Sequence, residues 1–306
     1  MGSEMCIRDS FSFLASGLTR PPTAQGVRAR NDLANFDEFP QSNTQLRHEA
    51  FQRSPWSWNH WIPDHNSHTF AGQDEINVHN VSVAAIDRLA GLGSLRPAHA
   101  GVTNADRDRM LRLVTQVGQQ RLTIPSFPSL DLLDDLVNVC MYADSNSIDS
   151  YLHAATFSCD SARCELLLAM VSAGSKHIAL GPVWKMGLVL QEVARLAIAE
   201  VFEKDNATTR ELQALQTYLL WLDIGAWSGL RRKTEIADSF LQPAVTMLSW
   251  SNAFARFRYH EIVPDHNDTS EALDAKWKAW TEQEGLKRLV FHAFLHDSQV
   301  AFANLN

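Results

Sequence analysis

Cysteine is scarce in this chain, which carries only Cys6, Cys140, Cys159 and Cys164 among its 306 residues. So sparse a set argues against a disulfide framework and favours a reducing compartment. The sequence also lacks any run near the roughly 18 uninterrupted apolar residues that a membrane helix needs, so we expect no membrane-spanning segment. Basic runs are missing too, and the formal net charge is −8. An acidic chain of this kind is a poor nucleic-acid binder by itself.

The first ten residues, M-G-S-E-M-C-I-R-D-S, are interpreted as a processing artefact. Residues 2–9 match the in-frame translation of a transposase-type sequencing adapter, and Ser10 straddles the junction. Without this segment three cysteines remain, because Cys6 belongs to it. The net charge becomes −7, since the two acids and one arginine of the segment sum to −1. We therefore expect the natural chain to continue upstream of residue 11.

Residues 11–100 have the composition of a disordered linker. Six of the eleven prolines and six of the twelve histidines fall there, among Asn, Ser, Gln and Gly, without a sustained apolar period. Such a segment cannot bury enough apolar surface to offset the entropy lost on ordering. The exception is residues 51–61, where four aromatic residues cluster and predict an anchor that docks onto a helical body. A partner-binding motif is the alternative interpretation of that cluster.

After residue 100 the apolar residues repeat with a helical period. Thr103 and Asp106 have the spacing of a capping box, and an i, i+3, i+4, i+7 apolar pattern follows. This pattern predicts a helix over residues 104–119. Residues 124–129 break it, because each of their two prolines removes a donor and disfavours helix before itself. Ser129 then suits the cap of a second helix, whose apolar face is Leu132, Leu133, Leu136, Val137 and Cys140.

Further helices are predicted downstream, and together they indicate an all-α fold over residues 101–306. Pro182 suits a first helical turn, and Thr208 suits an N-cap because Glu211 follows three residues later. No run alternates with period two for long enough to predict a strand. Helices with apolar stripes must bury them against one another, which defines a multi-helix domain. The predicted ranges are 161–175, 182–204, 208–227, 231–248 and 270–303.

Asp134 and Asp135 form a candidate magnesium site on the second predicted helix. Aspartate-rich magnesium sites need a third carboxylate about one turn away, but that turn offers Val137, Asn138 and Val139. A solvated acidic face near a helix start is therefore the favoured interpretation.

Cys159 and Cys164, with His153 and His177 on either side, are candidate zinc ligands. Tetrahedral zinc takes Cys and His in tight pairs, but neither histidine is paired. Cys164 also begins an apolar run, where a reduced cysteine is an ordinary small hydrophobe. The histidines within residues 64–68 are weaker candidates still, because they lie in the proline-rich region.

His292 and His296 lie four residues apart on one predicted helical face, a spacing that can hold a metal. The metalloprotease motif needs Glu directly after the first histidine, and Ala293 stands there instead. The favoured interpretation is that both histidines are solvent-side polar residues beside the apolar stripe.

Catalytic motifs are missing from the sequence. It contains no G-x-S-x-G, no phosphate-binding P-loop, no G-x-G-x-x-G and no H-E-x-x-H. Gly225 and Gly229 flank a turn at Trp227 and Ser228, where backbone freedom explains them without a phosphate. We therefore predict no catalytic, cofactor-binding or metal-binding residue in this chain, and no enzymatic activity.

The strongest basic cluster is Arg231, Arg232 and Lys233. Because Glu235 and Asp238 follow, a solvated or salt-bridged helix face is favoured over a DNA contact. Asp297 falls on the apolar stripe of the last helix, where burial would demand a partner. We therefore predict an ion pair between Asp297 and one of these three basic residues.

Several blocks of the chain form an ordered series: residues 51–58, 107–114, 127–133, 148–157, 166–174, 192–195, 202–206, 227–248 and 277–291. The series resembles the regulatory middle homology domain of fungal zinc-finger transcription factors, from about Trp56 to the last residues. The family hallmark I-H-x-x-T-F is matched by L-H-A-A-T-F at residues 152–157, which departs in its first position.

This resemblance implies a nuclear regulator of RNA polymerase II transcription whose helical domain restrains or transmits activation, through a ligand, a protein partner or a homodimer. Its closest group carries tandem two-Cys two-His zinc fingers upstream, which hold zinc and read DNA in the major groove. No such finger occurs before residue 100, so zinc and DNA are implied only for the parent protein. The family domain also continues past Asn306, which implies truncation at the C-terminal side.

Two other classes stay open at this point. A helical metal-dependent enzyme would show an ordered metal or a perturbed carboxylate cluster in a cleft. A stand-alone all-α interaction module would have a start codon just before residue 11. Paired zinc fingers encoded in frame upstream would instead support the regulator.

Overall fold

The computed structural model describes residues 74–79, 81, 101–119 and 121–304. The adapter-like segment, the aromatic cluster at residues 51–61, the histidines of residues 64–68 and most of the predicted linker lie outside these ranges. Helices make up most of the described chain, which confirms the all-α prediction. They are α4 (Asn104–Gly118), α5 (Leu130–Ser145), α6 (Cys164–Ser175), α7 (Gly181–Lys204), α8 (Leu212–Ala226), α9 (Arg231–Ser239), α10 (Leu241–Trp250) and α11 (Ser270–Asn304).

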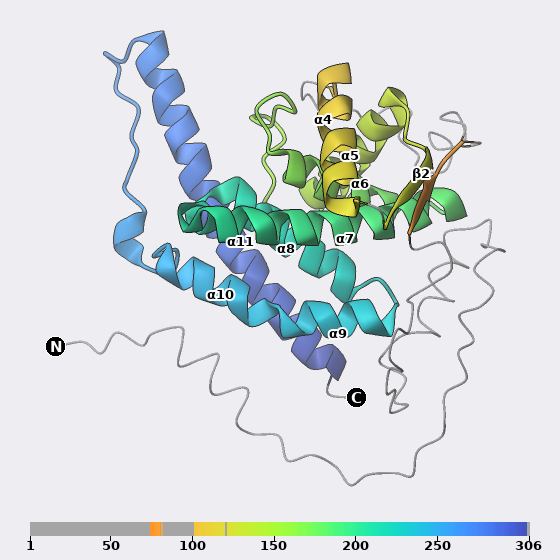
Figure 1. Cartoon of the computed structure of the whole chain (residues 1–306). Helices are drawn as coiled ribbons and strands as arrows, with labels where there is room; N and C mark the ends of the chain where they lie inside the picture. Colours follow the sequence, from red (N-terminus) through yellow and green to blue (C-terminus); the bar gives the residue numbers. More distant parts are fainter. Residues whose placement is uncertain (1–73, 80, 82–100, 120, 305–306) are drawn as a thin grey trace, which may run out of the picture.

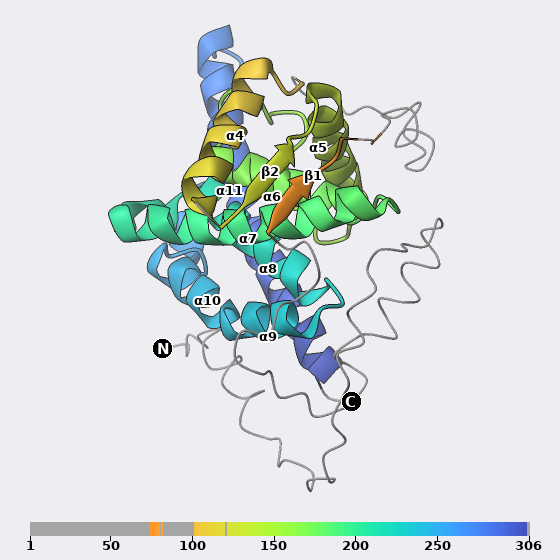
Figure 2. The same cartoon turned by 45° about the vertical axis from the view of Figure 1, so that its right-hand side comes forward.

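Helix α6 is the centre of the core. Every residue from Leu166 to Ser175 is buried, and the helix packs against α5, α7 and α8. Figures 1 and 2 show α4, α5 and α6 on one side of the long helix α7, with α9 and α10 on the other. The apolar stripes predicted from periodicity therefore meet in one continuous core.

Two of the three predicted helix caps, Thr103 and Ser129, are confirmed. The backbone N–H of Asp106 donates to Thr103 Oγ1 at 3.2 Å, and the Thr103 N–H donates back to Asp106 Oδ2 at 2.9 Å. At α5, Ser129 Oγ accepts from the Leu132 N–H at 3.3 Å. Each cap satisfies donors that the first helical turn leaves unpaired.

A short parallel sheet was not predicted. Strand β1 (Glu75–Asn77) pairs with β2 (Thr123–Ser126), and Ile76, the middle residue of β1, is fully buried. The linker prediction is therefore wrong for this short part of residues 11–100, because Ile76 joins the main core. Strands of three and four residues are too short to show alternation, and Pro125 within β2 further hides the signal.

Two helix boundaries differ from the predictions. Thr208 lies in a 3₁₀ turn, η2 (Asn206–Arg210), where its hydroxyl donates to the carbonyl of Asp205, so it does not cap α8. The predicted helix over residues 231–248 is divided at Phe240 into α9 and α10. Pro243 explains the division, because its ring would clash with a carbonyl one turn earlier in a continuous helix but is tolerated in a first turn.

Helix α11 is 35 residues long and crosses the molecule against α8 and α10. Its second half buries Leu286, Leu289, Ala293 and Val300, while its first turns extend past the other helices (Figures 1 and 2). A second 3₁₀ turn, η3 (Arg256–Arg258), lies in the connection between α10 and α11. No helix in the described ranges has the length and apolar character needed to cross a membrane.

Candidate functional site

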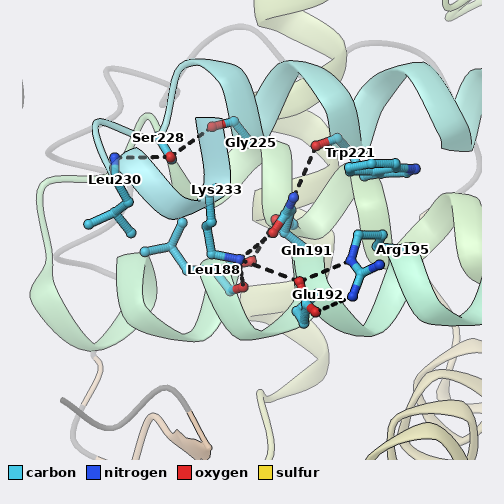
Figure 3. A network of polar contacts seen from close by, with 11 residues as sticks. Leu188, Gln191, Glu192, Arg195, Trp221, Gly225, Ser228, Leu230 and Lys233 are labelled. Carbon is cyan, nitrogen blue, oxygen red and sulfur yellow. Dashed lines mark hydrogen bonds and ion pairs between the residues drawn. The ribbon is translucent and has the colours of Figure 1, made fainter. Parts of the chain in front are cut away.

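The first of two buried polar clusters surrounds the ammonium group of Lys233 on α9 (Figure 3). Lys233 is only 5% exposed, and Nζ donates to the carbonyl of Leu188 at 3.1 Å and to the side-chain oxygen of Gln191. The carboxylate Oε2 of Glu192 lies 3.9 Å from the same nitrogen. All three partners belong to α7, so this lysine ties α9 to α7.

Gln191 and Glu192 extend the cluster in two directions (Figure 3). Gln191 Nε2 donates to the carbonyl of Trp221 on α8 at 3.1 Å. The two oxygens of Glu192 accept from the Arg195 guanidinium at 2.5 and 3.2 Å. The cluster therefore joins α7, α8 and α9. We call it the lysine cluster, made of Gln191, Glu192, Arg195 and Lys233.

The turn between α8 and α9 positions Lys233. Gly229 has a φ of 73°, a left-handed conformation that favours glycine. Ser228 Oγ donates to the carbonyl of Gly225 at 2.8 Å and accepts from the Leu230 N–H at 3.2 Å. A Cβ atom on Gly225 would lie 3.1 Å from the Ala237 Cβ. The predicted turn is confirmed, and close helix contact is a second reason for glycine at 225.

Burial and charge act in opposite directions within the lysine cluster. Burial lowers the pKa of Lys233 to about 8, although the Glu192 carboxylate acts to raise it. For Glu192, burial acts to raise the pKa, but the Arg195 hydrogen bond and the charge of Lys233 outweigh burial and hold it below the usual value. At neutral pH the cluster therefore contains two cations that share one carboxylate, and this pairing holds only while the helices stay together.

The second cluster lies where α11 crosses α8. Asp223 on α8 uses both carboxylate oxygens: Oδ2 lies 2.8 Å from His292 Nε2, and Oδ1 lies 2.6 Å from His296 Nδ1. The other nitrogen of His292, Nδ1, lies 2.9 Å from Asp149 Oδ2. We call Asp149, Asp223, His292 and His296 the histidine cluster. It joins α8, α11 and the loop after α5.

The geometry determines the protonation state of His292. Both ring nitrogens face ionised carboxylates, which only accept, so both nitrogens must carry protons. Burial acts to lower the pKa of His292, but Asp223 and Asp149 outweigh it and raise the pKa to about 10. The hydrogen bond from His292 in turn lowers the pKa of Asp149 to about 2. Burial acts to raise the pKa of Asp223, but the charge of His292 and the two histidine hydrogen bonds hold it far below its usual range.

The loop that supplies Asp149 is itself held by a carboxylate. Asp144, in the last turn of α5, accepts from Ser150 Oγ at 2.7 Å and from the backbone N–H of Leu152 at 3.1 Å. The Tyr151 ring is buried and packs on His292 with 4.3 Å between ring centroids. The segment that resembles the family hallmark therefore begins directly against the histidine cluster.

The prediction that His292 and His296 face solvent is wrong. His296 is only 2% exposed, and both rings lie on the same helical stripe as Leu289 and Ala293. The apolar period predicts this stripe correctly, but the polarity of the two histidines places them at its edge. Asp223 was not singled out, although a lone carboxylate in the apolar run of α8 is a signal that a buried cation must be near.

Asp134 and Asp135 are not a solvated face, so that prediction is also wrong. Asp134 Oδ1 accepts from the Val102 N–H at 2.9 Å, and its Oδ2 accepts from Asn138 at 3.1 Å. Asp135 is buried. Asp134 therefore fixes the entry into α4 against α5, a contact between segments 32 residues apart that helix periodicity cannot show.

The two cysteines lie at different places, Cys159 buried and Cys164 partly buried. Cys159 is fully buried, its carbonyl accepts from Arg109 at 3.0 Å, and Cys164 begins α6. Burial raises the pKa of both thiols to about 12. His153 lies within 2.8 Å of Thr156 Oγ1 and packs edge-on against the ring of Trp277. Among the described residues, no three His, Cys, Asp or Glu side chains converge as metal ligands.

The prediction of an ion pair to Asp297 is wrong for Lys233, whose ammonium contacts α7 instead. Burial raises the pKa of Asp297, the neighbouring His296 acts to lower it, and Asp238 acts to raise it. The basic residues 231–233 were predicted to form a solvated or salt-bridged helix face. This prediction is wrong for Lys233, which is buried.

Comparisons with known proteins give three fungal relatives, of which two are named transcription factors and one a zinc finger protein. Transcription factor 1 of Elsinoe fawcettii is 23% identical over 142 residues, which is 46% of this chain and 15% of that protein. Zinc finger protein klf1 of Schizosaccharomyces pombe is 24% identical over 150 residues, 49% of this chain and 19% of the relative. Transcription factor PfmaH of Pestalotiopsis fici is 23% identical over 142 residues, 46% of this chain and 14% of the relative.

The chain thus matches less than a fifth of the length of each relative. No protein-family model matches it, and no solved structure matches it. The sequence is similar to two fungal transcription factors and to a fungal zinc finger protein, and its fold is all-α.

Proposed function

We propose that this chain is the helical regulatory domain, of the middle homology type, of a fungal zinc-finger transcription factor that controls RNA polymerase II transcription. The observation that carries the proposal is its similarity to two transcription factors and a zinc finger protein from three different fungi. In this proposal the domain is one part of a longer nuclear protein, because the similarity covers only 14 to 19% of each relative. Zinc and DNA would be bound by fingers elsewhere in that protein.

The two buried clusters support regulation better than catalysis. Within each cluster the charged groups pair with one another, and each cluster joins elements that are distant in sequence. A carboxylate already occupied by two histidines has little capacity left to act on a substrate. We therefore infer a non-enzymatic domain in which α7, α8, α9 and α11 are held in one arrangement.

Regulation by such a domain requires a second arrangement and a partner that prefers one of the two. The two arrangements would differ at the histidine cluster, because it joins the long helix α11 to α8. Its buried charges are stabilised only while the two helices are in contact, and separating the helices would break their pairing. A ligand or protein that displaces α11 would have to compensate the buried charges of Asp223 and His292. The contact is therefore either made or broken, with few intermediate states.

A stand-alone interaction module is the second candidate function. Leu273, Trp277 and Trp280 lie at i, i+4 and i+7 on the first half of α11, and all three are exposed. The two tryptophan rings stack with centroids 5.3 Å apart. Exposed aromatic stripes of this kind are typical of protein-binding surfaces. The same stripe also suits a partner of a transcription regulator.

The coding sequence upstream of residue 11 separates these two candidates. The genomic locus and the complete transcript should be sequenced, and the frame read toward the 5′ end. Tandem two-Cys two-His fingers in the same frame would support the proposal. A start codon directly before residue 11, with no finger in the transcript, would overturn it in favour of the interaction module.

A further inference from the structure

The end of α10 and the 3₁₀ turn η3 that follows expose two aromatic rings and two cationic side chains. Trp250 is 70% exposed and Phe257 is 71% exposed, and Arg256 and Arg258 on either side of Phe257 are exposed as well. Figure 1 shows that α10 ends at the edge of the molecule, where the chain turns toward the start of α11. We call Trp250, Arg256, Phe257 and Arg258 the basic aromatic patch.

The patch has no ionic partner in the described part of the chain. None of the ion pairs among the described residues involves Arg256 or Arg258, and Glu261, three residues after Arg258, is itself exposed. Arginine and aromatic residues together are the types most enriched in interaction surfaces. Two exposed arginines that have no ion-pair partner among the described residues, together with two exposed rings, favour an occupant that is both acidic and apolar.

We propose that the basic aromatic patch binds residues 32–39 of the same chain, D-L-A-N-F-D-E-F, which lie outside the described ranges. This segment carries a charge of −3 within eight residues and contains no basic residue, although two arginines precede it at positions 28 and 30. It holds three of the seven acidic residues between positions 1 and 73.

The chemistry of the two surfaces is complementary in both charge and apolar contact. Leu33, Phe36 and Phe39 supply apolar groups at a spacing of three residues among the acids. Guanidinium groups pair with carboxylates through charge-assisted hydrogen bonds, and they also pack on aromatic rings. The exposed rings of Trp250 and Phe257 would cover the apolar residues of the segment while the arginines pair with its acids.

The length of the intervening chain permits this contact. Residues 40–73 separate the segment from Asp74, and 34 residues span at most about 110 Å when extended. A compact domain of the 206 residues from 101 to 306 has a radius of gyration of about 17 Å and so a diameter near 45 Å. Every point on its surface is therefore within reach of residues 32–39.

Attachment to the same chain makes even a weak contact significantly populated. A tethered segment has an effective concentration of about 1 mM, so a contact with a Kd of roughly 0.1 mM would be about tenfold more bound than free. Acidic residues interspersed with apolar ones are the composition of transcriptional activation segments. Taken with the proposed function, the contact would therefore mask such a segment; the contact itself does not depend on that function.

Hydrogen exchange of the full 306-residue chain, read by mass spectrometry, tests the contact. We expect residues 32–39 to exchange about tenfold more slowly in the wild type than in the double variant R256E/R258E. The matched control is R112E/R121E, which makes the same charge change at two exposed arginines far from the patch and should leave the exchange of residues 32–39 unchanged. Replacing Asp32, Asp37 and Glu38 by lysine in the R256E/R258E background should restore the protection.

Three results would overturn the proposal: equal exchange in the wild type and R256E/R258E, loss of protection in the control as well, or protection that grows with protein concentration. The last result would mean that a second copy provides the occupant. Protection should also disappear near 1 M salt, where the Debye length falls to about 3 Å. Masking is tested separately, since R256E/R258E should raise transcription from a tethered reporter; a failure there with the exchange result intact would contradict only the masking.

Discussion

At the scale of single residues, the histidine cluster joins elements of the fold in a way that the sequence pattern does not reveal. Asp223, His292 and His296 come from two helices about 70 residues apart, and no local rule connects them. Spacing predicted that the two histidines share a helix face, which is correct. Their burial could not be predicted, because it depends on a carboxylate supplied by another element.

The substitution Asp223→Asn should destabilise the domain strongly. It leaves the His292 imidazolium buried with Asp149 as its remaining anion, and breaking a buried ion pair on one side costs roughly 3–5 kcal/mol. For a domain of this size, 3 kcal/mol corresponds to a decrease in Tm of about 6–12 °C. Asp274→Asn, at an exposed site on α11, is the matched control and should stay within about 0.5 kcal/mol of the wild type. Equal urea midpoints for the two variants would rule out a structural role for Asp223.

Stability should fall as the pH rises from about 6.5 to 8. The pKa of His292 is raised from 6.5 to about 10 in the folded state, so the stabilisation is complete below pH 6.5 and is lost as the pH rises toward 10. The slope of unfolding free energy approaches −1.4 kcal/mol per pH unit in this window. The window stops at 8 because Lys233, whose pKa is lowered to about 8, contributes with the opposite sign above it.

Urea unfolding at several pH values between 6.5 and 8 measures this slope. In the His292→Gln variant the slope should disappear, because glutamine does not titrate. A slope that persists unchanged in this variant would show that another group is responsible.

At the scale of elements, sequence patterns were informative where helices are long and regular. The caps at Thr103 and Ser129 and the turn at Gly229 were predicted from residue type, because each depends on local chemistry. The predictions of secondary structure were wrong where the local structure depends on a neighbouring element. Strand β1 depends on pairing with β2 across the chain, and the division of α9 from α10 depends on how one proline is accommodated.

The crossing of α5 and α6 should not tolerate a side chain at Gly174. A Cβ atom there would lie 2.0 Å from the main-chain oxygen of Leu136, and a backbone atom cannot move aside without displacing α5. Gly174→Ala should therefore destabilise by about 3 kcal/mol or more, at the upper end of the cost of overpacking. Denaturant unfolding measures it.

Gly285→Ala on α11 is the matched control for Gly174→Ala. Its Cβ would meet only the flexible end of Leu212 at 2.9 Å, and alanine is favoured over glycine in a helix by about 1 kcal/mol. The control should be neutral or stabilising. If both variants lost the same stability, the close approach of α5 and α6 would not be the cause.

At the scale of the whole molecule, the fold class was predictable from sequence, but the arrangement of its helices was not. Two buried polar clusters, both built on α8 and its neighbours, specify how α7, α9 and α11 meet it. Their charges come from residues that look ordinary one at a time, such as the third member of a basic triplet. The proposed function rests mainly on similarity to known proteins. The described residues contain no convergent metal ligands, and the motifs of catalysis are missing from the sequence.

A tethered reporter in a fungal cell tests most directly whether this chain regulates transcription. The full chain should be fused to a heterologous DNA-binding domain, with the Asp223→Asn and Asp274→Asn variants beside it and protein amounts matched. We predict that the fusion changes reporter transcription several-fold relative to the DNA-binding domain alone, in either direction, and that Asp223→Asn removes this change while Asp274→Asn keeps it. A folded, nuclear fusion that leaves transcription at the level of the DNA-binding domain alone would contradict the proposed function.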